Sequence, residues 1–206
     1  MLPPPDANPS TSANLLQAAL HLLTEIGGVV ASTTELRPIL DAVVQKTTAL
    51  MQADEGSIKL LGADAAAPAQ TIVRKDRDLG LGSWEMPITM SVMGYLMAKR
   101  RPVATPDILD DAEFSGLRGF QSHVRAVLAV PLVVENRITG FLAVTNRTPG
   151  RQWRTDEIEL MGIVGNNSAV MIEQARLRVE AAEKKRVEEE NRRLERELDL
   201  AREIQK

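Results

Sequence analysis

Apolar residues recur at steps of three and four in two segments near the start of the chain, which is the spacing of one face of an α-helix. The first segment begins at Asn14, and its apolar positions are Leu15, Ala19, Leu22 or Leu23, Ile26 and Val30. The second follows Thr34, a suitable N-cap residue, and its positions are Leu36, Ile39, Val43, Thr47 and Leu50. The sequence therefore predicts two amphipathic helices, the first weakened at its end by Gly27 and Gly28.

The pattern then changes to the short apolar runs that are typical of β-strands. "EGSIKLL" (55–61) and "QTIVRK" (70–75) predict two neighbouring strands. "SVMGYLMAKRR" (91–101) predicts a short helix with Val92 and Leu96 directed inward. The chain extends again at "PVATPDI", because a residue that precedes proline avoids the helical conformation.

The segment "RAVLAVPLVVENRITGFLAVTNR" (125–147) holds two apolar, β-branched runs on either side of "ENR". Asn136 tolerates the left-handed conformation that a tight turn needs, so the segment predicts a central antiparallel hairpin. Pro131 cannot donate a hydrogen bond to a neighbouring strand, and we therefore expect a β-bulge near it.

A long helix is predicted to begin at Thr155 or Asp156. Its buried positions are expected to be Ile158, Met161, Val164 or Gly165, Ser168, Ile172 and Ala175. Helices that precede, interrupt and follow a set of consecutive strands are typical of the α+β class. The sequence thus predicts a central antiparallel β-sheet with helices packed on it, followed by a long C-terminal coiled-coil helix.

The last part of that helix has a different character from Arg178 onward. Residues 178–206 contain nine basic and nine acidic residues and no broad apolar face, so they cannot join a globular core. Two sets of positions repeat by seven, with Val187, Leu194 and Ala201 as d and Asn191, Leu198 and Gln205 as a. This pattern predicts a parallel dimeric coiled coil, with a single solvated helix as the alternative. Ala175, Val179 and Ala182 fit another frame, which predicts a phase shift near residues 182–187.

Composition excludes several classes of function. With no Cys in the chain, disulfides, thiolate zinc sites and thiol nucleophiles are impossible. A net charge of -3 and an aromatic content of 3% disfavour nucleic acid as a partner. No segment approaches the length of a membrane span, and a cytoplasmic location is expected. Neither His21 nor His123 has acidic neighbours at metal-ligand spacing, so no metal site is predicted.

Three segments resemble the GAF sensory domain family when they are taken in order along the chain. They are "GYLMAKRRPVATPDI", the hairpin segment quoted above, and "IELMGIVGNNSAVMIEQARL". The resemblance spans roughly residues 15–177, although Arg101 replaces a glycine common in the family. It implies a regulatory domain that either binds a small molecule beside its sheet or acts as a dimerising scaffold without ligand.

By this resemblance the ligand site lies between the sheet and the loops over one face. The residues we expect there are Trp84, Met86, Tyr95, Asp107 and Phe114; alternatively the aromatic residues complete the core and Asp107 caps the "DDAEF" turn. No cofactor is evident, and the site is a candidate for a small-molecule ligand that the sequence does not identify. Cyclic-nucleotide-binding members carry a structural salt bridge that an Arg147–Glu157 pair would reproduce here, and nucleotide binding is therefore an alternative.

The final residues "LERELDLAREIQK" resemble the helical linker that joins GAF domains to PPM-type serine/threonine phosphatase domains of bacterial partner-switching pathways. The expected organisation is a disordered leader (1–13), a GAF-like sensory domain (14–177) and a signalling helix (178–206) that is cut before an output domain. The chain itself has no catalytic constellation and is not expected to be an enzyme. We expect a homodimer formed through the N- and C-terminal helices, which relays ligand or partner binding to the phosphatase output domain. The alternatives are a ligand-free dimerisation scaffold, or a cyclic-nucleotide-binding GAF domain attached to a kinase, cyclase or transcription regulator.

Overall fold

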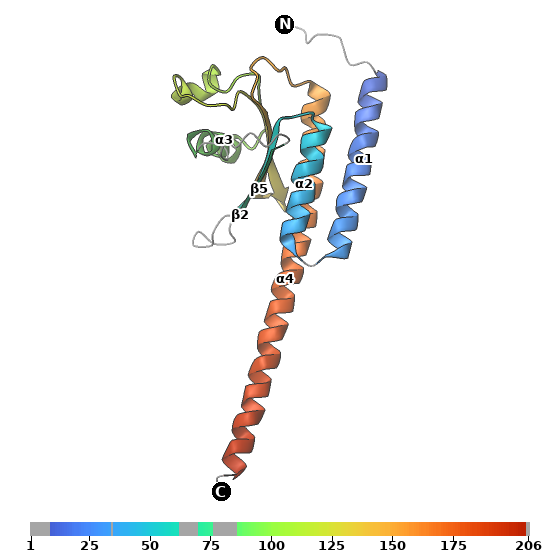
Figure 1. Cartoon of the computed structure of the whole chain (residues 1–206), viewed down its shortest axis with the longest axis vertical. Helices are drawn as coiled ribbons and strands as arrows, with labels where there is room; N and C mark the ends of the chain where they lie inside the picture. Colours follow the sequence, from blue (N-terminus) through green and yellow to red (C-terminus); the bar gives the residue numbers. More distant parts are fainter. Residues whose placement is uncertain (1–8, 34, 62–69, 76–85, 205–206) are drawn as a thin grey trace.

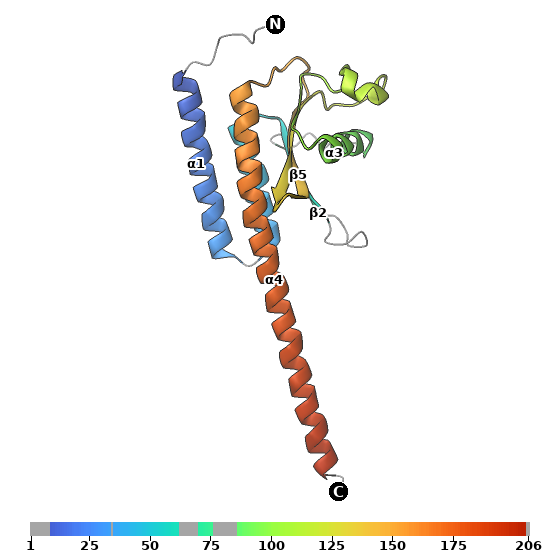
Figure 2. The ribbon, with the colours of Figure 1, turned by 180° about the vertical axis from the view of Figure 1, so that it is seen from behind.

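The structure, a computed structural model, describes residues 9–33, 35–61, 70–75 and 86–204. A single sheet separates two layers of helices, and one long helix extends far beyond this body (Figures 1 and 2). In chain order the elements are α1 (Pro9–Ser32), α2 (Leu36–Leu50), β1 (Glu55–Leu60), β2 (Gln70–Lys75), α3 (Met86–Lys99), β3 (Val103–Thr105), the 3-10 helix η1 (Ala112–Leu117), β4 (Ala126–Val134), β5 (Arg137–Asn146) and α4 (Thr155–Ile204). The predicted α+β class is confirmed.

The five described strands lie in the order β2-β1-β5-β4-β3, and each neighbouring pair is antiparallel. The β4–β5 hairpin is central to this sheet, as predicted. Its turn residues Glu135 and Asn136 both have positive φ, with values of 48° and 65°. The strand register shifts between Leu132 and Val133, so the β-bulge expected near Pro131 is present.

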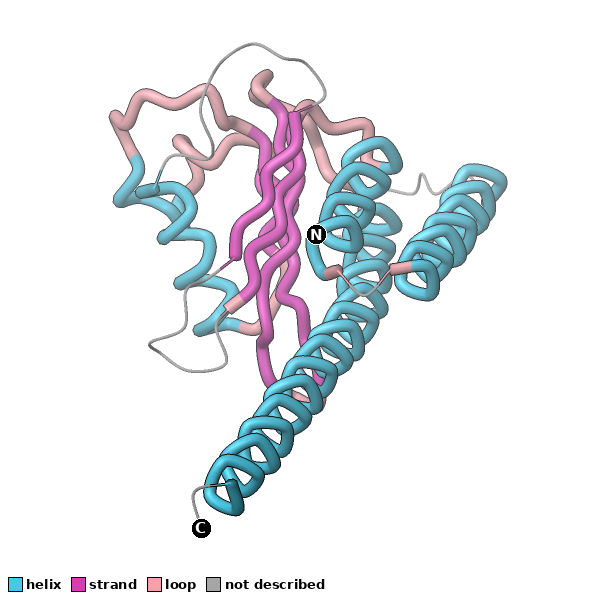
Figure 3. Tube along the Cα trace, turned by 60° about the horizontal axis from the view of Figure 1, so that its bottom comes forward, coloured by secondary structure: helices cyan, strands magenta, loops and turns pink. Residues whose placement is uncertain are grey.

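One face of the sheet packs against α2 and α4, and we call it the helical face; α1 packs on these two helices from the side away from the sheet (Figure 3). Its buried side chains include Ile58 of β1, Leu128 of β4, Leu142 of β5, Val43 of α2 and Met161 of α4. The predicted apolar stripes of these helices are buried as expected at Ala19, Leu22, Ile26, Val30, Ile39, Val43, Val164, Ile172 and Ala175. This core is thus built mainly of aliphatic side chains and methionine, as the low aromatic content of the chain requires.

The opposite face, which we call the distal face, is covered by α3 and η1 (Figures 1 and 3). Successive residues of a strand point to opposite faces, so Val127, Ala129, Phe141 and Ala143 face this second core. The face also receives Ile88, Val92 and Leu96 from α3, as the sequence predicted for the last two. A domain with two separate cores on its two sheet faces results.

Two helix boundaries differ from the predictions. The helix predicted to start at Asn14 begins at Pro9, and it continues through Gly27 and Gly28 to Ser32. A Cβ at either glycine would meet no atom within 4 Å, so the helix passes them without any packing demand for glycine. Thr34, the predicted N-cap, lies outside the described residues, and the N-cap of α2 is Glu35 without a side-chain capping bond.

The last helix, α4, is a single uninterrupted helix of 50 residues. Among the α4 residues up to 197, whose burial is described, the last buried one is Ala175, and we call the following residues, 176–204, the rod. At about 1.5 Å per residue the rod extends roughly 40 Å from the body. Ala175 points into the domain's own core, so it does not belong to a surface seam as the predicted phase shift assumed.

The body half of α4 approaches the sheet most closely at Gly165. A Cβ built on Gly165 would lie 2.8 Å from Cγ2 of Val130 on β4. Real Cβ contacts are essentially never this short, so only glycine permits the observed distance between α4 and the sheet. The residue therefore sets how deeply the long helix is seated.

Candidate functional site

Two of the predicted site residues meet on the distal face. The rings of Tyr95 on α3 and Phe114 on η1 have centroids 5.6 Å apart and planes inclined at 44°. Such tilted ring pairs are favourable arrangements of aromatic side chains. Phe114 is buried and Tyr95 is half-buried, so the pair joins α3 to η1 at the border of the second core.

The other predicted aromatic and sulfur-containing residues are not brought into this pair. Trp84 lies outside the described residues. Met86 is the first residue of α3, which begins before the predicted start at Ser91. The described part of the expected site thus consists of Tyr95 and Phe114, with Asp107 nearby in sequence to η1.

Asp107 is engaged in an ion pair. Its Oδ1 accepts a hydrogen bond from Nε of Arg125 at 2.9 Å, and its Oδ2 contacts the Arg125 terminal nitrogen. The backbone N–H of Leu109 also donates to Oδ1 at 3.1 Å. The hydrogen bonds from Arg125 hold the pKa of the Asp107 carboxyl below its ordinary value.

The suggestion that Asp107 caps the "DDAEF" turn is wrong. The cap is Asp111, whose Oδ1 accepts from the backbone N–H of Glu113 at 2.9 Å. Asp107 lies one turn earlier and fixes the segment that leads from β3 to η1 onto the start of β4.

Replacing Asp107 with asparagine should lower the free energy of unfolding by about 1–2 kcal/mol at pH 7, because a charge-assisted pair is lost. The folded pKa lies below the unfolded value of about 3.9, so the pair stabilises the fold above that pH and is lost as the pH falls further. Urea denaturation at pH 7 and at acidic pH measures this. The difference between Asp107→Asn and the parent should shrink on acidification, and a difference unchanged with pH would contradict the assignment.

The exposed neighbour Asp110 offers a matched control. It contributes only a longer-range attraction to Arg125. Asp110→Asn should therefore change the stability by less than about 0.5 kcal/mol at either pH.

A second polar group on the distal face was missed by the sequence reasoning. Glu55, the first residue of β1, is only 1% exposed, and its Oε1 accepts from a terminal nitrogen of Arg147 at 2.6 Å. Nε2 of His123 lies 3.5 Å from the same oxygen. Strand alternation predicts that Glu55 and Ser57 share one face of β1 and that Thr145 and Arg147 share one face of the β5 segment, but it does not predict that β1 and β5 are neighbours.

This pair corrects the predicted Arg147–Glu157 salt bridge. Arg147 bonds to Glu55, whereas Oε1 of Glu157 accepts from Arg151 at 3.2 Å. The salt bridge that would have matched cyclic-nucleotide-binding relatives is therefore not formed.

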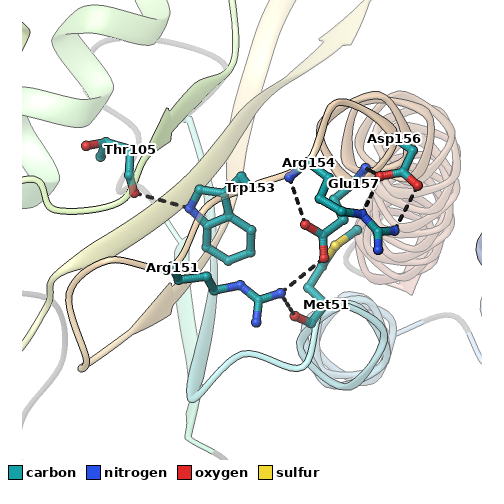
Figure 4. Close-up of polar contacts among 7 residues, drawn as sticks. All are labelled: Met51, Thr105, Arg151, Trp153, Arg154, Asp156 and Glu157. Atoms are coloured by element: carbon teal, nitrogen blue, oxygen red, sulfur yellow. Dashed lines mark hydrogen bonds and ion pairs between the residues drawn. The ribbon is translucent and has the colours of Figure 1, made fainter. Parts of the chain in front are cut away.

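Arg151 and Trp153 connect the distal side to the start of α4 (Figure 4). Arg151 donates to the backbone oxygen of Met51, at the end of α2, at 2.7 Å and lies over the Trp153 ring at 4.3 Å. The indole N–H of Trp153 donates to the backbone oxygen of Thr105 in β3 at 3.2 Å. Glu157 also accepts from the backbone N–H of Arg154 at 2.9 Å, as in a capping box. The first turn of α4 is thus tied to β3 and to α2.

Comparison with known families identifies the fold. A model of the GAF domain family matches residues 35–172, about two thirds of the chain. The chain belongs to the GAF domain family. The match confirms the resemblance seen in the three quoted segments. GAF domains are regulatory sensory modules of signalling proteins. A comparison with curated protein sequences gives no match.

Solved GAF domains have the same fold. The GAF domain of an Acinetobacter phosphoenolpyruvate-protein phosphotransferase is 19% identical, with a TM-score of 0.59 over 77% of this chain and 94% of that one. The corresponding domain from Coxiella burnetii is 16% identical, with a TM-score of 0.60 over 79% and 96%. The free methionine-R-sulfoxide reductase of Neisseria meningitidis is 20% identical, with a TM-score of 0.54 over 78% and 93%.

Bilin-binding relatives are also among the similar structures. A phycocyanobilin-bound GAF domain from a cyanobacterial phytochrome is 19% identical, with a TM-score of 0.59 over 78% of this chain and 96% of that one. Covalent attachment through cysteine is impossible in this GAF domain, because its sequence has no Cys. At these identities the similarity establishes the fold and leaves the ligand open.

Within the described ranges, no helix is both long enough and apolar enough to span a membrane. The same part of the chain contains no group of three or more His, Cys, Asp or Glu side chains that could hold a metal ion. His21 is an exposed side chain 3.8 Å from Glu25, and His123 belongs to the Glu55 group.

Proposed function

We propose that this GAF domain is the regulatory sensory and dimerisation module of a bacterial, cytoplasmic signalling protein. Binding of a small molecule or protein at the distal face is relayed through α4 to an output domain. The output domain is a PPM-type serine/threonine phosphatase. The observation that carries the proposal is that α4 is at once part of the sensory body and a rod reaching beyond it.

The contacts at the start of α4 support a relay. Thr105 of β3 and the segment held by Asp107 border the distal face, and Trp153 is bonded to that same Thr105. Arg151 lies over the Trp153 ring and bonds to both Met51 and Glu157 (Figure 4). A shift of β3 would therefore move Trp153 and, with it, the arginine that holds the first turn of α4. A helix is stiff along its hydrogen-bonded axis, so a shift of its first turn would also displace the rod.

An apolar stripe on α4 supports a dimer. Ile163, Val170 and Leu177 repeat by seven and are 44%, 44% and 54% exposed. The same seven-residue frame continues through Lys184 to Asn191, Leu198 and Gln205, which are the predicted a positions. Val187 and Leu194, the first two predicted d positions, are likewise exposed. Ala175, which belongs to the other predicted frame, is buried in the core of the body and takes no part in this stripe.

A second copy of the chain is the occupant that fits this stripe. Lone apolar residues on the surface need no explanation, but exposed apolar side chains at a positions 163, 170 and 177 and at d positions 187 and 194 of one helix do. The rod carries equal numbers of acidic and basic residues, so two copies would not repel each other. Glu197, which now bonds to Arg193 of its own helix at 3.0 Å, is placed at g to meet Arg202 at e of the other copy.

Changing the length of the rod tests the relay in the full-length protein. Deleting residues 180–183 rotates everything beyond by about 40° relative to the body, whereas deleting residues 180–186 nearly preserves the heptad frame. We expect the four-residue deletion to change phosphate release from a phosphoserine peptide by at least about fivefold, as typical coupling energies allow. The seven-residue deletion should behave like the parent. Equal activity of all three proteins would contradict the relay.

The identity of the output domain has a direct test of its own. The coding sequence beyond Lys206 should continue into Leu-Leu-Pro and then into a domain with the Asp-Gly motif of metal-dependent phosphatases. A continuation into a kinase, cyclase or DNA-binding domain would contradict the phosphatase proposal while leaving the sensory module unaffected.

A dimerising scaffold without ligand is the second candidate function. The burial of Phe114 against Tyr95 favours it, because these side chains complete the core of the distal face. Thermal melting with a panel of metabolites separates the two functions. A sensor should gain several degrees at ligand concentrations far above Kd, and a scaffold should gain nothing.

A further inference from the structure

We infer that the Glu55–Arg147 pair is the polar end of a binding site on the distal face, and that this site takes the amide or lactam edge of an uncharged small molecule. The inference rests on the proposed sensory function and specifies what is sensed. It is carried by two buried atoms that the fold leaves without partners, Oε2 of Glu55 and Nε of Arg147.

The ion pair between these residues is half formed. A guanidinium and a carboxylate can form two parallel hydrogen bonds, one from a terminal nitrogen and one from Nε. Here the terminal nitrogen of Arg147 bonds to Oε1 of Glu55 at 2.6 Å, whereas Nε and Oε2 remain unpaired. Nε2 of His123, which lies 3.5 Å from Oε1, has no hydrogen-bond partner either. A buried charged group without its hydrogen bonds is costly, so the pair favours a further molecule that supplies the missing donor and acceptor.

The charges in the group favour an uncharged occupant. Glu55 and Arg147 neutralise each other, whereas the nearby Asp54 carboxylate, which accepts from the backbone N–H of Arg147 at 2.9 Å, is partly exposed to solvent. An added ion would bring an unbalanced charge to a residue that is 1% exposed. The unpaired atoms instead require one donor, for Oε2, and one acceptor, for Nε. A cis amide presents its N–H and its C=O side by side and supplies both.

The surrounding strands offer a surface for the rest of such a molecule. Along the distal face the row that pairs Glu55 with Thr145 is followed by the rows Ser57 with Ala143 and Lys59 with Phe141. Ser57 is partly exposed, so the buried pair has a neighbour that solvent reaches. Ala143 and Phe141 are each only 5% exposed, so the rest of such a molecule would lie over Ser57 and Lys59, whose side chains are partly exposed.

The test uses 2-pyrrolidone, a lactam, and N-methyl-2-pyrrolidone, which lacks the N–H donor. Both are added to the whole chain, and binding is followed by two-dimensional NMR of the backbone amides. We expect 2-pyrrolidone to shift the signals of Glu55, Ser57 and Thr145 with a Kd of about 1–10 mM, as its few heavy atoms allow. The N-methyl compound should bind at least about tenfold more weakly, since one hydrogen bond is worth about that factor.

Two variants make the result specific. Glu55→Gln should weaken 2-pyrrolidone binding by at least about fivefold, because it removes the charged acceptor. Ser57→Leu leaves the ion pair intact and places a larger side chain in the next row of the distal face, so it should weaken the binding of 2-pyrrolidone; thermal melting of this variant checks that it is folded. If neither compound shifts these signals, if both bind equally, or if Ser57→Leu binds as the parent does, an ordered water fills the site and the inference is overturned.

The outcome is separable from that of the proposed function. A dimer that binds neither compound would retain the relay and lose this site. A monomer that binds 2-pyrrolidone as described would retain this site and lose the relay.

Discussion

Replacing Gly165 with leucine should lower the free energy of unfolding by about 3 kcal/mol, an overpacking effect at the upper end of the usual range. A Cβ at this position would already lie 2.8 Å from Cγ2 of Val130, so a larger side chain forces α4 away from the sheet. Because α4 runs from the sensory body into the rod, a change at Gly165 also alters most directly how closely α4 lies against the sheet.

Gly162 on the same helix provides the control. A Cβ there would meet no atom within 4 Å, so Gly162→Leu should be neutral or stabilising, since leucine has the higher helix propensity. Thermal melting of the two variants should differ by roughly 10 °C, at about 2–4 °C per kcal/mol for a domain of this size. A Gly165→Leu protein that melts with the parent would show that α4 is not held against β4 as described.

Placing charges on the apolar stripe should dissociate the proposed dimer. In the variant with Val170→Asp and Leu177→Asp, four carboxylates would face one another across the two α4 helices and displace four apolar side chains. We expect the dissociation constant to rise at least about 100-fold, which corresponds to roughly 2.7 kcal/mol. Both residues are exposed in the single chain, so the fold itself should be nearly unaffected.

Met97→Asp is the matched control, because Met97 is an equally exposed apolar residue on α3, on the other side of the sheet (Figure 2). Light scattering after size-exclusion chromatography should give a dimer for the control and a monomer for the double variant. Dissociation of both variants, or of neither, would place the interface elsewhere.

The sequence predicted the features that depend on local patterns. The helical stripes ending at Val30 and Ala175, the hairpin turn at Asn136 and the bulge near Pro131 all follow from spacing and backbone preferences of neighbouring residues. The weakening predicted at Gly27 and Gly28 does not interrupt α1, because packing of the helix on α2 and α4 outweighs the low helix propensity of glycine.

The spacing of residues alone does not predict contacts between residues that are far apart in the sequence. Arg147 pairs with Glu55, 92 positions away, and not with the nearer Glu157. Arg151 reaches Met51 across 100 positions. Both depend on strand order, which places β1 beside β5 and brings the end of α2 next to the loop that precedes α4. Of these two arginines, Arg151 also bonds to Glu157 in the first turn of α4.

The parallel pairing of two α4 rods is the central claim, and cross-linking tests it most directly because the chain has no native cysteine. Leu194→Cys places one thiol at a d position, within disulfide reach of its copy in a parallel, in-register dimer, whereas Arg193→Cys points outward at c. Under mild oxidation we predict that only Leu194→Cys gives a band at twice the 22.6 kDa mass of the chain on a non-reducing gel. Equal cross-linking of the two variants, or none at position 194, would contradict the account.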